Sequence, residues 1–83
     1  MRVIKKYDVE KREIVDCKVK KEWRLALWNT DPDDVVNCAQ CGIKLRYKDC
    51  CTSEELIGGA GIGYGVCSLC SKKERVRLLI NNA

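Results

Sequence analysis

The sequence predicts a small α+β protein. Three observations carry this prediction: apolar residues alternate with polar ones near the N-terminus, two identical C-x2-C units follow, and a run of helix formers comes after the second unit. The chain has 83 residues, which allows one compact domain with a modest core. Domains of this size often need a staple such as a bound metal ion or a partner subunit.

The N-terminal part, residues 1–29, is expected to form an antiparallel β-meander. Period-two alternation over residues 2–8, 13–20 and 22–29 is typical of half-buried strands. Residues 18–28 also admit a helix, because Val19, Trp23 and Leu27 would share one helical face. Residues 30–37, which hold three aspartates and the single proline, are expected to be an acidic linker or turn.

The remaining residues, 38–83, are expected to form a four-cysteine finger that packs with the N-terminal part in one domain. Residues 43–50 have strand character, and residues 52–57 would form the far side of the same hairpin. A glycine-rich loop over residues 58–65 leads into a strand at 64–66.

Four of the seven cysteines form two C-x2-C units that are separated by 25 residues: Cys38, Cys41, Cys67 and Cys70. Two residues between cysteines let one turn aim both sulfurs at the same ion, and a second such turn completes a tetrahedron of thiolates. The chain has no histidine, and soft thiolates favour zinc, with iron as the competitor. We therefore expect one structural Zn²⁺ bound by these four residues; a redox disulfide or inert buried thiols are the alternatives.

A C-terminal helix over residues 71–81 is expected to begin at the second pair, since Leu69, Val76 and Ile80 recur at helical spacing. Gly42 directly follows the first pair, where a positive φ lets backbone amides point at sulfur. A knuckle, a hairpin and a helix in this order predict a treble-clef finger, with a zinc ribbon as the nearest alternative. The remaining Cys17, Cys50 and Cys51 are expected to be small buried hydrophobes; a second metal site or a ligand shared with a partner is the alternative.

The predicted site argues against enzymatic activity. Four cysteine ligands leave no open position for water or substrate, and the absence of histidine removes the commonest general base. No small-molecule substrate is expected. Binding of a protein partner is the favoured function, because a small core is not expected to hide all of the aromatic residues Trp23, Trp28, Tyr47 and Tyr64.

Two other functions remain open. Nucleic-acid binding is favoured by the net charge of +4 and by Lys72, Lys73, Arg75 and Arg77 on the predicted helix. Electron transfer is the third function, because rubredoxins also use two C-x2-C-G knuckles, although here Ser71 follows the second pair. The apolar runs are too short to span a bilayer and the N-terminus lacks an apolar signal region, so we expect a cytoplasmic protein without membrane contact.

Residues 38–75, from Cys38-Ala-Gln-Cys41-Gly42 through Val66-Cys67-Ser-Leu-Cys70, resemble the small four-cysteine fingers of Firmicute and phage proteins. Among these the sequence is loosely similar to the Gin type of sporulation anti-sigma factor, a zinc protein that acts by binding a sigma factor. The resemblance covers about half of the chain. It implies the four cysteines as zinc ligands in a small bacterial or phage protein with a regulatory or accessory role.

Overall fold

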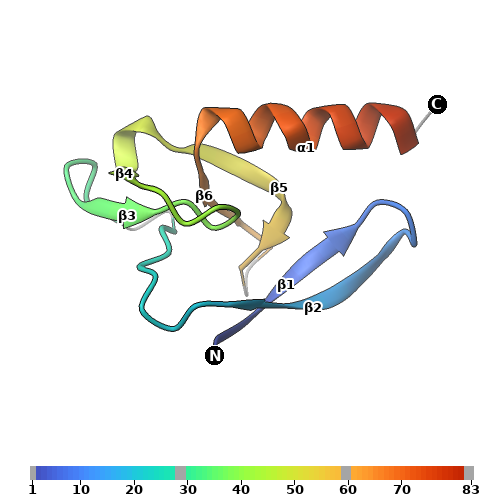
Figure 1. Cartoon of the computed structure of the whole chain (residues 1–83), viewed down its shortest axis with the longest axis horizontal. Coiled ribbons are helices and arrows are strands. Elements are labelled where there is room, and N and C mark those ends of the chain that lie inside the picture. Colours follow the sequence, from blue (N-terminus) through green and yellow to red (C-terminus); the bar gives the residue numbers. More distant parts are fainter. Residues whose placement is uncertain (1, 28–29, 59–60, 82–83) are drawn as a thin grey trace.

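The computed structural model describes residues 2–27, 30–58 and 61–81, and it confirms the α+β class. A four-stranded antiparallel sheet has the strand order β2-β1-β5-β6, a two-stranded sheet pairs β3 with β4, and one helix lies along the larger sheet (Figure 1). The elements are β1 (Arg2–Asp8), β2 (Glu13–Val19), β3 (Val35–Asn37), β4 (Lys44–Arg46), the short 3-10 helix η1 (Tyr47–Asp49), β5 (Cys51–Ile57), β6 (Gly63–Val66) and α1 (Ser68–Asn81).

The first two predicted strands are confirmed as the hairpin of β1 and β2. Their pairing runs from Arg2 opposite Val19 to Asp8 opposite Glu13. No Asn-Gly turn joins them; instead a carboxylate oxygen of Asp8 accepts hydrogen bonds from the backbone N–H groups of Glu10 and Lys11, at 3.0 and 3.2 Å. An aspartate of this kind stabilises a turn by replacing a backbone acceptor.

The third strand of the predicted meander, over residues 22–29, is wrong, and so is its helical alternative. Residues 22–27 form only a single bridge, in which Leu25 lies opposite Asn37, and residues 28–29, including Trp28, lie outside the described part. The backbone carbonyls of this segment accept hydrogen bonds from other parts of the chain. The carbonyl of Arg24 accepts from Asn37 N–H at 2.8 Å, and the carbonyl of Ala26 accepts from Gly65 N–H at 3.0 Å. These bonds place residues 22–27 across the finger instead of beside β2.

The predicted hairpin between residues 43–50 and 52–57 is also wrong in its pairing. The first of these strands is shortened to β4, which pairs with β3, so the segment expected as an acidic linker, 30–37, ends in a strand. The chain turns at η1 because the N–H groups of Tyr47 and Lys48 donate to the carbonyls of Asp34 and Pro32, at 2.9 and 3.0 Å. β5 then pairs with β1 and β6, and β6 contains the strand predicted at 64–66.

The core joins the larger sheet to the cysteine units. Buried apolar residues from β1, β2, β5 and β6 form one cluster with three of the predicted ligands: Ile4, Val19, Leu56, Tyr64, Val66, Cys38, Ala39, Cys67 and Cys70. The two C-x2-C units are therefore part of the hydrophobic core.

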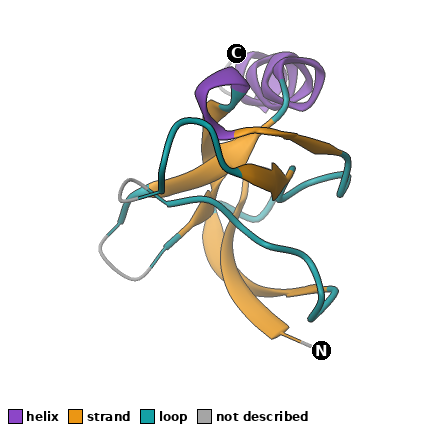
Figure 2. Cartoon of the chain, turned by 90° about the vertical axis from the view of Figure 1, so that its left-hand side faces the viewer, coloured by secondary structure: helices purple, strands orange, loops and turns teal. Residues whose placement is uncertain are grey.

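The C-terminal helix is confirmed and begins at the second cysteine pair as predicted, at Ser68. Its predicted apolar positions Leu69, Val76 and Ile80 are all exposed, whereas Ser71 and Glu74 are buried. A view turned by a right angle shows the helix on one side of the strands, with much of its circumference turned away from them (Figure 2). Among the described residues no helix has the length and apolar character needed to cross a membrane.

Candidate metal centre

The two C-x2-C units meet at one point. The first lies between β3 and β4, and the second lies where β6 ends and α1 begins. The sulfur atoms of the four residues lie within 4.8 Å of one another: Cys38, Cys41, Cys67 and Cys70. Three of these side chains are buried and Cys41 is exposed. The structure thus brings together all four residues that the sequence predicts as ligands.

The backbone of the first unit folds into a tight loop around its sulfurs. Cys38 N–H donates to the carbonyl of Ile43 at 2.8 Å, and Gly42 N–H donates to the carbonyl of Cys38 at 2.9 Å. Gly42 has a φ of +82°, as predicted from its place after the second cysteine. A Cβ atom built on Gly42 would lie 2.2 Å from an atom of the Trp23 ring. Position 42 therefore admits only glycine without a shift of the backbone or the ring.

Asn37 connects this loop to residues 22–27. Its side-chain amide donates to the carbonyl of Gly42 at 2.9 Å, and its side-chain oxygen accepts from the N–H of Arg24 at 2.9 Å. Both ends of one side chain are thus bonded to backbone groups of different segments. This explains why the segment predicted as a third strand instead braces the first cysteine unit.

The second unit is aligned with the first by direct bonds between them. Cys67 N–H donates to the sulfur of Cys38 at 3.3 Å, and Ala39 N–H donates to the carbonyl of Gly65 at 3.1 Å. The N–H of Ser71 donates to the carbonyl of Cys67 at 3.0 Å, which begins the helical bonding of α1. Cys70 consequently lies in the first turn of α1.

Three of the four thiols have shifted acidities: Cys38, Cys41 and Cys70. Burial alone would raise the pKa of the Cys38 thiol, but backbone N–H groups of Cys41, Cys67 and Gln40 donate hydrogen bonds to it. Together these bonds outweigh burial and lower the pKa from 9.0 to about 7. Burial raises the pKa of Cys41 and of Cys70. The pKa of Cys38 is therefore shifted in the direction opposite to those of Cys41 and Cys70.

The donor set fits a tetrahedral zinc ion. Sulfurs at about 2.3 Å from a central zinc lie about 3.8 Å from one another. The sulfurs of Cys41 and Cys67 are 3.9 Å apart. Four thiolates fill a tetrahedral site, and the N–H bond to the Cys38 sulfur is the kind of outer contact that supports a ligating thiolate.

The other three cysteines lie outside the cluster of four. Cys17, Cys50 and Cys51 are half-buried instead of fully buried as predicted, and Cys17 and Cys51 pack against the core. Burial raises the pKa of Cys50 to about 11, with nearby Cys38 as a further cause. Cys50 is thus a protonated thiol at neutral pH that lies outside the cluster of four sulfurs.

A buried polar network beside the sulfurs was missed by the sequence analysis. Gln40, which lies between the first two cysteines, donates through its side-chain amide to Glu55 at 3.1 Å and to Glu74 at 2.9 Å. Ser53 donates through its hydroxyl to Glu74 at 2.5 Å. Both carboxylates are buried, with 1% of each residue exposed. The network links the first cysteine unit, β5 and α1.

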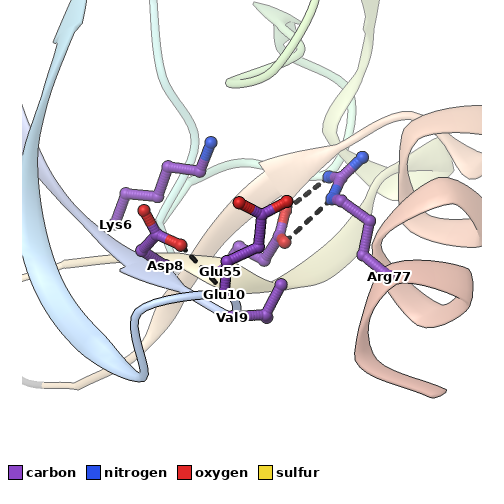
Figure 3. Close-up of a pocket in the computed structure, with 6 residues that line it drawn as sticks. All are labelled: Lys6, Asp8, Val9, Glu10, Glu55 and Arg77. Carbon is purple, nitrogen blue, oxygen red and sulfur yellow. Dashed lines mark hydrogen bonds and ion pairs between the residues drawn. The ribbon is translucent and has the colours of Figure 1, made fainter. Parts of the chain in front are cut away.

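Arg77 completes this network from α1. Its guanidinium forms a two-pronged contact with the Glu55 carboxylate, with Nε at 2.9 Å from Oε2. The contact with Glu55 raises the pKa of Arg77. Figure 3 shows the pair at one end of a cavity of about 220 Å³ that Lys6 and Glu10 also line. The spacing of these polar residues in the sequence could have indicated the network. Ser53 and Glu55 share one face of a strand, and Glu74 and Arg77 are one helical turn apart.

The four residues predicted to bind nucleic acid do not form a single patch. Lys72, Lys73 and Arg75 are exposed on α1, whereas Arg77 is half-buried against Glu55. Comparisons with protein-family models, with curated proteins and with solved structures find no match for the chain. The resemblance to the Gin type therefore gains no support from them.

Proposed function

We propose that the protein is a non-enzymatic module with one structural zinc ion, and that it binds a protein partner as a regulatory or accessory component. The cluster of four sulfurs within 4.8 Å carries the zinc part of this proposal. Bound zinc would supply a cross-link between the first cysteine loop and α1, in a layout like that of a treble clef. Four thiolate ligands leave no coordination position for a substrate, which supports a structural role.

Exposed apolar side chains support the proposal of a protein partner. In the described part of the chain, nine large hydrophobic residues are more than one-third exposed: Val3, Ile14, Val35, Ile43, Ile62, Leu69, Val76, Leu79 and Ile80. Four of the nine lie on α1, and contiguous exposed apolar surface is typical of interaction sites. The aromatic anchors expected from the sequence contribute less, because Tyr64 is buried and Trp23 packs against Gly42.

Nucleic-acid binding is the second candidate, favoured by the exposed cations Lys72, Lys73 and Arg75. It is the weaker one, since Arg77 is engaged with Glu55 and aliphatic residues lie among the three cations. An electron carrier with iron in the same site is the third candidate, because four thiolates bind either metal.

Affinity capture with the zinc-loaded full chain tests the proposed function. We expect a protein to co-purify in about equal amount, to withstand nuclease and moderate salt, and to be lost with the Cys67→Ser variant. The Cys17→Ser variant is the matched control, because Cys17 lies outside the sulfur cluster. Capture of nucleic acid alone, with a steep loss between low and physiological salt, would replace the protein-binding proposal by the nucleic-acid one.

A further inference from the structure

Helix α1 is amphipathic, but its polar side is buried and its apolar side is exposed. The side that packs against the sheet is largely polar and includes Ser71, Glu74 and Arg77. The opposite side carries four aliphatic residues that are between 54% and 74% exposed: Leu69, Val76, Leu79 and Ile80. A surface helix ordinarily buries its apolar side and exposes its polar one. We call these four residues, with the exposed Lys72, Lys73 and Arg75, the outward face.

The four aliphatic residues of the outward face form a stripe along one side of the helix, in which Lys72 and Lys73 lie between Leu69 and Val76. At 100° per residue they fall within an arc of about 100°, and the buried Glu74 lies on the other side of the helix. From Leu69 to Ile80 the stripe is about 16 Å long at 1.5 Å per residue. These are the dimensions of a helix face that lies in contact with another helix.

We propose that the outward face of α1 docks an amphipathic helix of a protein partner whose apolar stripe is flanked by aspartate or glutamate residues. This proposal rests on the proposed function and specifies its partner. It follows from the charges around the stripe and from a cavity beside it.

The charges on the outward face favour a partner helix with acidic residues. Three cations lie on the outward face, and Glu74, the single acidic residue of α1, is buried in bonds to Gln40, Ser53 and the backbone of Glu54. An acid-flanked helix would therefore meet opposite charges over residues 72–75 of the stripe. A second copy of this chain would set like charges against one another, which disfavours self-association through this face.

A cavity next to the stripe favours a protein over a lipid surface. It has a volume of about 210 Å³ and is lined by Glu54, Arg75, Leu78 and Leu79. A cavity of this size accepts one aliphatic side chain, and an anchor residue in a pocket is the usual centre of a protein interface. The stripe also contains no aromatic residue of the kind that anchors helices at a membrane surface.

A displayed library of helical peptides, selected on the zinc-loaded full chain, tests the proposal. We expect the selected peptides to carry apolar residues at helical spacing flanked by Asp or Glu. Binding of a selected peptide should weaken at least about tenfold with the Val76→Ser/Leu79→Ser variant and with the Lys72→Glu/Lys73→Glu variant. The Ile14→Ser variant is the matched control, because Ile14 is 60% exposed on β2, and it should leave the affinity unchanged. Zinc content and circular dichroism of each variant verify that the fold is retained.

Three results would overturn the proposal. Peptides whose binding depends on Ile14 or Ile43 instead of α1 would refute this docking surface while leaving the proposed function intact. Binding of the chain to phosphatidylglycerol vesicles, abolished by Leu79→Ser, would show that the face serves a membrane. A dimer in sedimentation equilibrium that the same substitution dissociates would show that the occupant is a second copy. Failure of both the library and the affinity capture would instead remove the proposed function itself.

Discussion

The indole ring of Trp23 lies directly over Gly42, so close that a Cβ atom at position 42 would be 2.2 Å from the ring. Gly42 belongs to the first cysteine loop and Trp23 belongs to the segment that follows the N-terminal hairpin. The contact explains how two parts of the chain with different sequence patterns share one core. Position 42 therefore requires glycine for two reasons: its φ is +82°, and the Trp23 ring leaves no space for a Cβ atom.

Substitution of Gly42 by alanine should destabilise the protein by about 3 kcal/mol, because it adds a steric clash to the cost of a left-handed backbone. Gly61 is the matched control. It has a φ of +78° but no atom within 4 Å of its Cβ position, so Gly61→Ala should cost only about 1–2 kcal/mol. Urea unfolding of the zinc-loaded variants measures both values, and equal losses would contradict the role of Trp23.

The ion pair between Arg77 and Glu55 should contribute more to the stability of the fold than the exposed ion pair between Lys5 and Asp16. Arg77→Met leaves the buried carboxylate of Glu55 with Gln40 as its remaining side-chain donor, and we expect a loss of about 2 kcal/mol. Asp16→Asn, which breaks the exposed pair of Asp16 with Lys5, should cost about 0.5 kcal/mol or less.

Restoring the charge balance provides a further test of this pair. The Arg77→Met/Glu55→Gln variant should recover part of the stability lost in Arg77→Met, because no unpaired buried charge remains at position 55. Thermal unfolding of the three variants under one buffer condition compares them. A double variant that is no more stable than Arg77→Met would contradict this interpretation.

Zinc affinity should fall as the pH falls. Cys41 and Cys70 have raised pKa values and carry protons at neutral pH, so each must release a proton on binding zinc. Below about pH 7 Cys38 also becomes protonated, since its pKa is about 7, and a further proton must leave. Competition with a coloured chelator between about pH 6 and pH 8 should therefore show about two or more protons released per zinc ion. A pH-independent affinity would rule out these thiols as the ligands.

The metal site was predictable because its signal is local. Two residues between the paired cysteines fix the direction of both sulfurs, and Gly42 marks the backbone turn, so the four residues could be identified before their meeting point was known. The first hairpin, β5, β6 and α1 were predictable for the same reason, since each has a local periodicity.

The pairing of the strands was not predictable, because it depends on contacts between distant segments. Residues 22–27 have the alternation of a strand, yet their backbone groups bond to Asn37 and Gly65. The strand at 52–57 pairs with β1, which is about 50 residues away in the sequence, instead of with the segment just before it. A period of two shows that a strand exists and does not show which neighbour it takes.

The orientation of α1 was not predictable from its apolar spacing. Apolar spacing predicts the buried side of a helix only when the helix buries its apolar side. Here Gln40 and Ser53 donate to carboxylates that α1 and β5 turn inward, so Glu74 is buried and Leu79 is exposed.

Metal content is the most direct test of the central claim, that four cysteines hold one structural zinc ion. The protein should be purified under reducing conditions without added metal, and its metal content and visible spectrum measured together with those of Cys67→Ser and Cys17→Ser. We predict one zinc per chain and no colour for the natural sequence and for Cys17→Ser, and loss of zinc and of helicity for Cys67→Ser. Stoichiometric zinc retained in Cys67→Ser, or no metal in the natural protein, would contradict the claim, and iron with visible thiolate absorption would replace it by electron transfer.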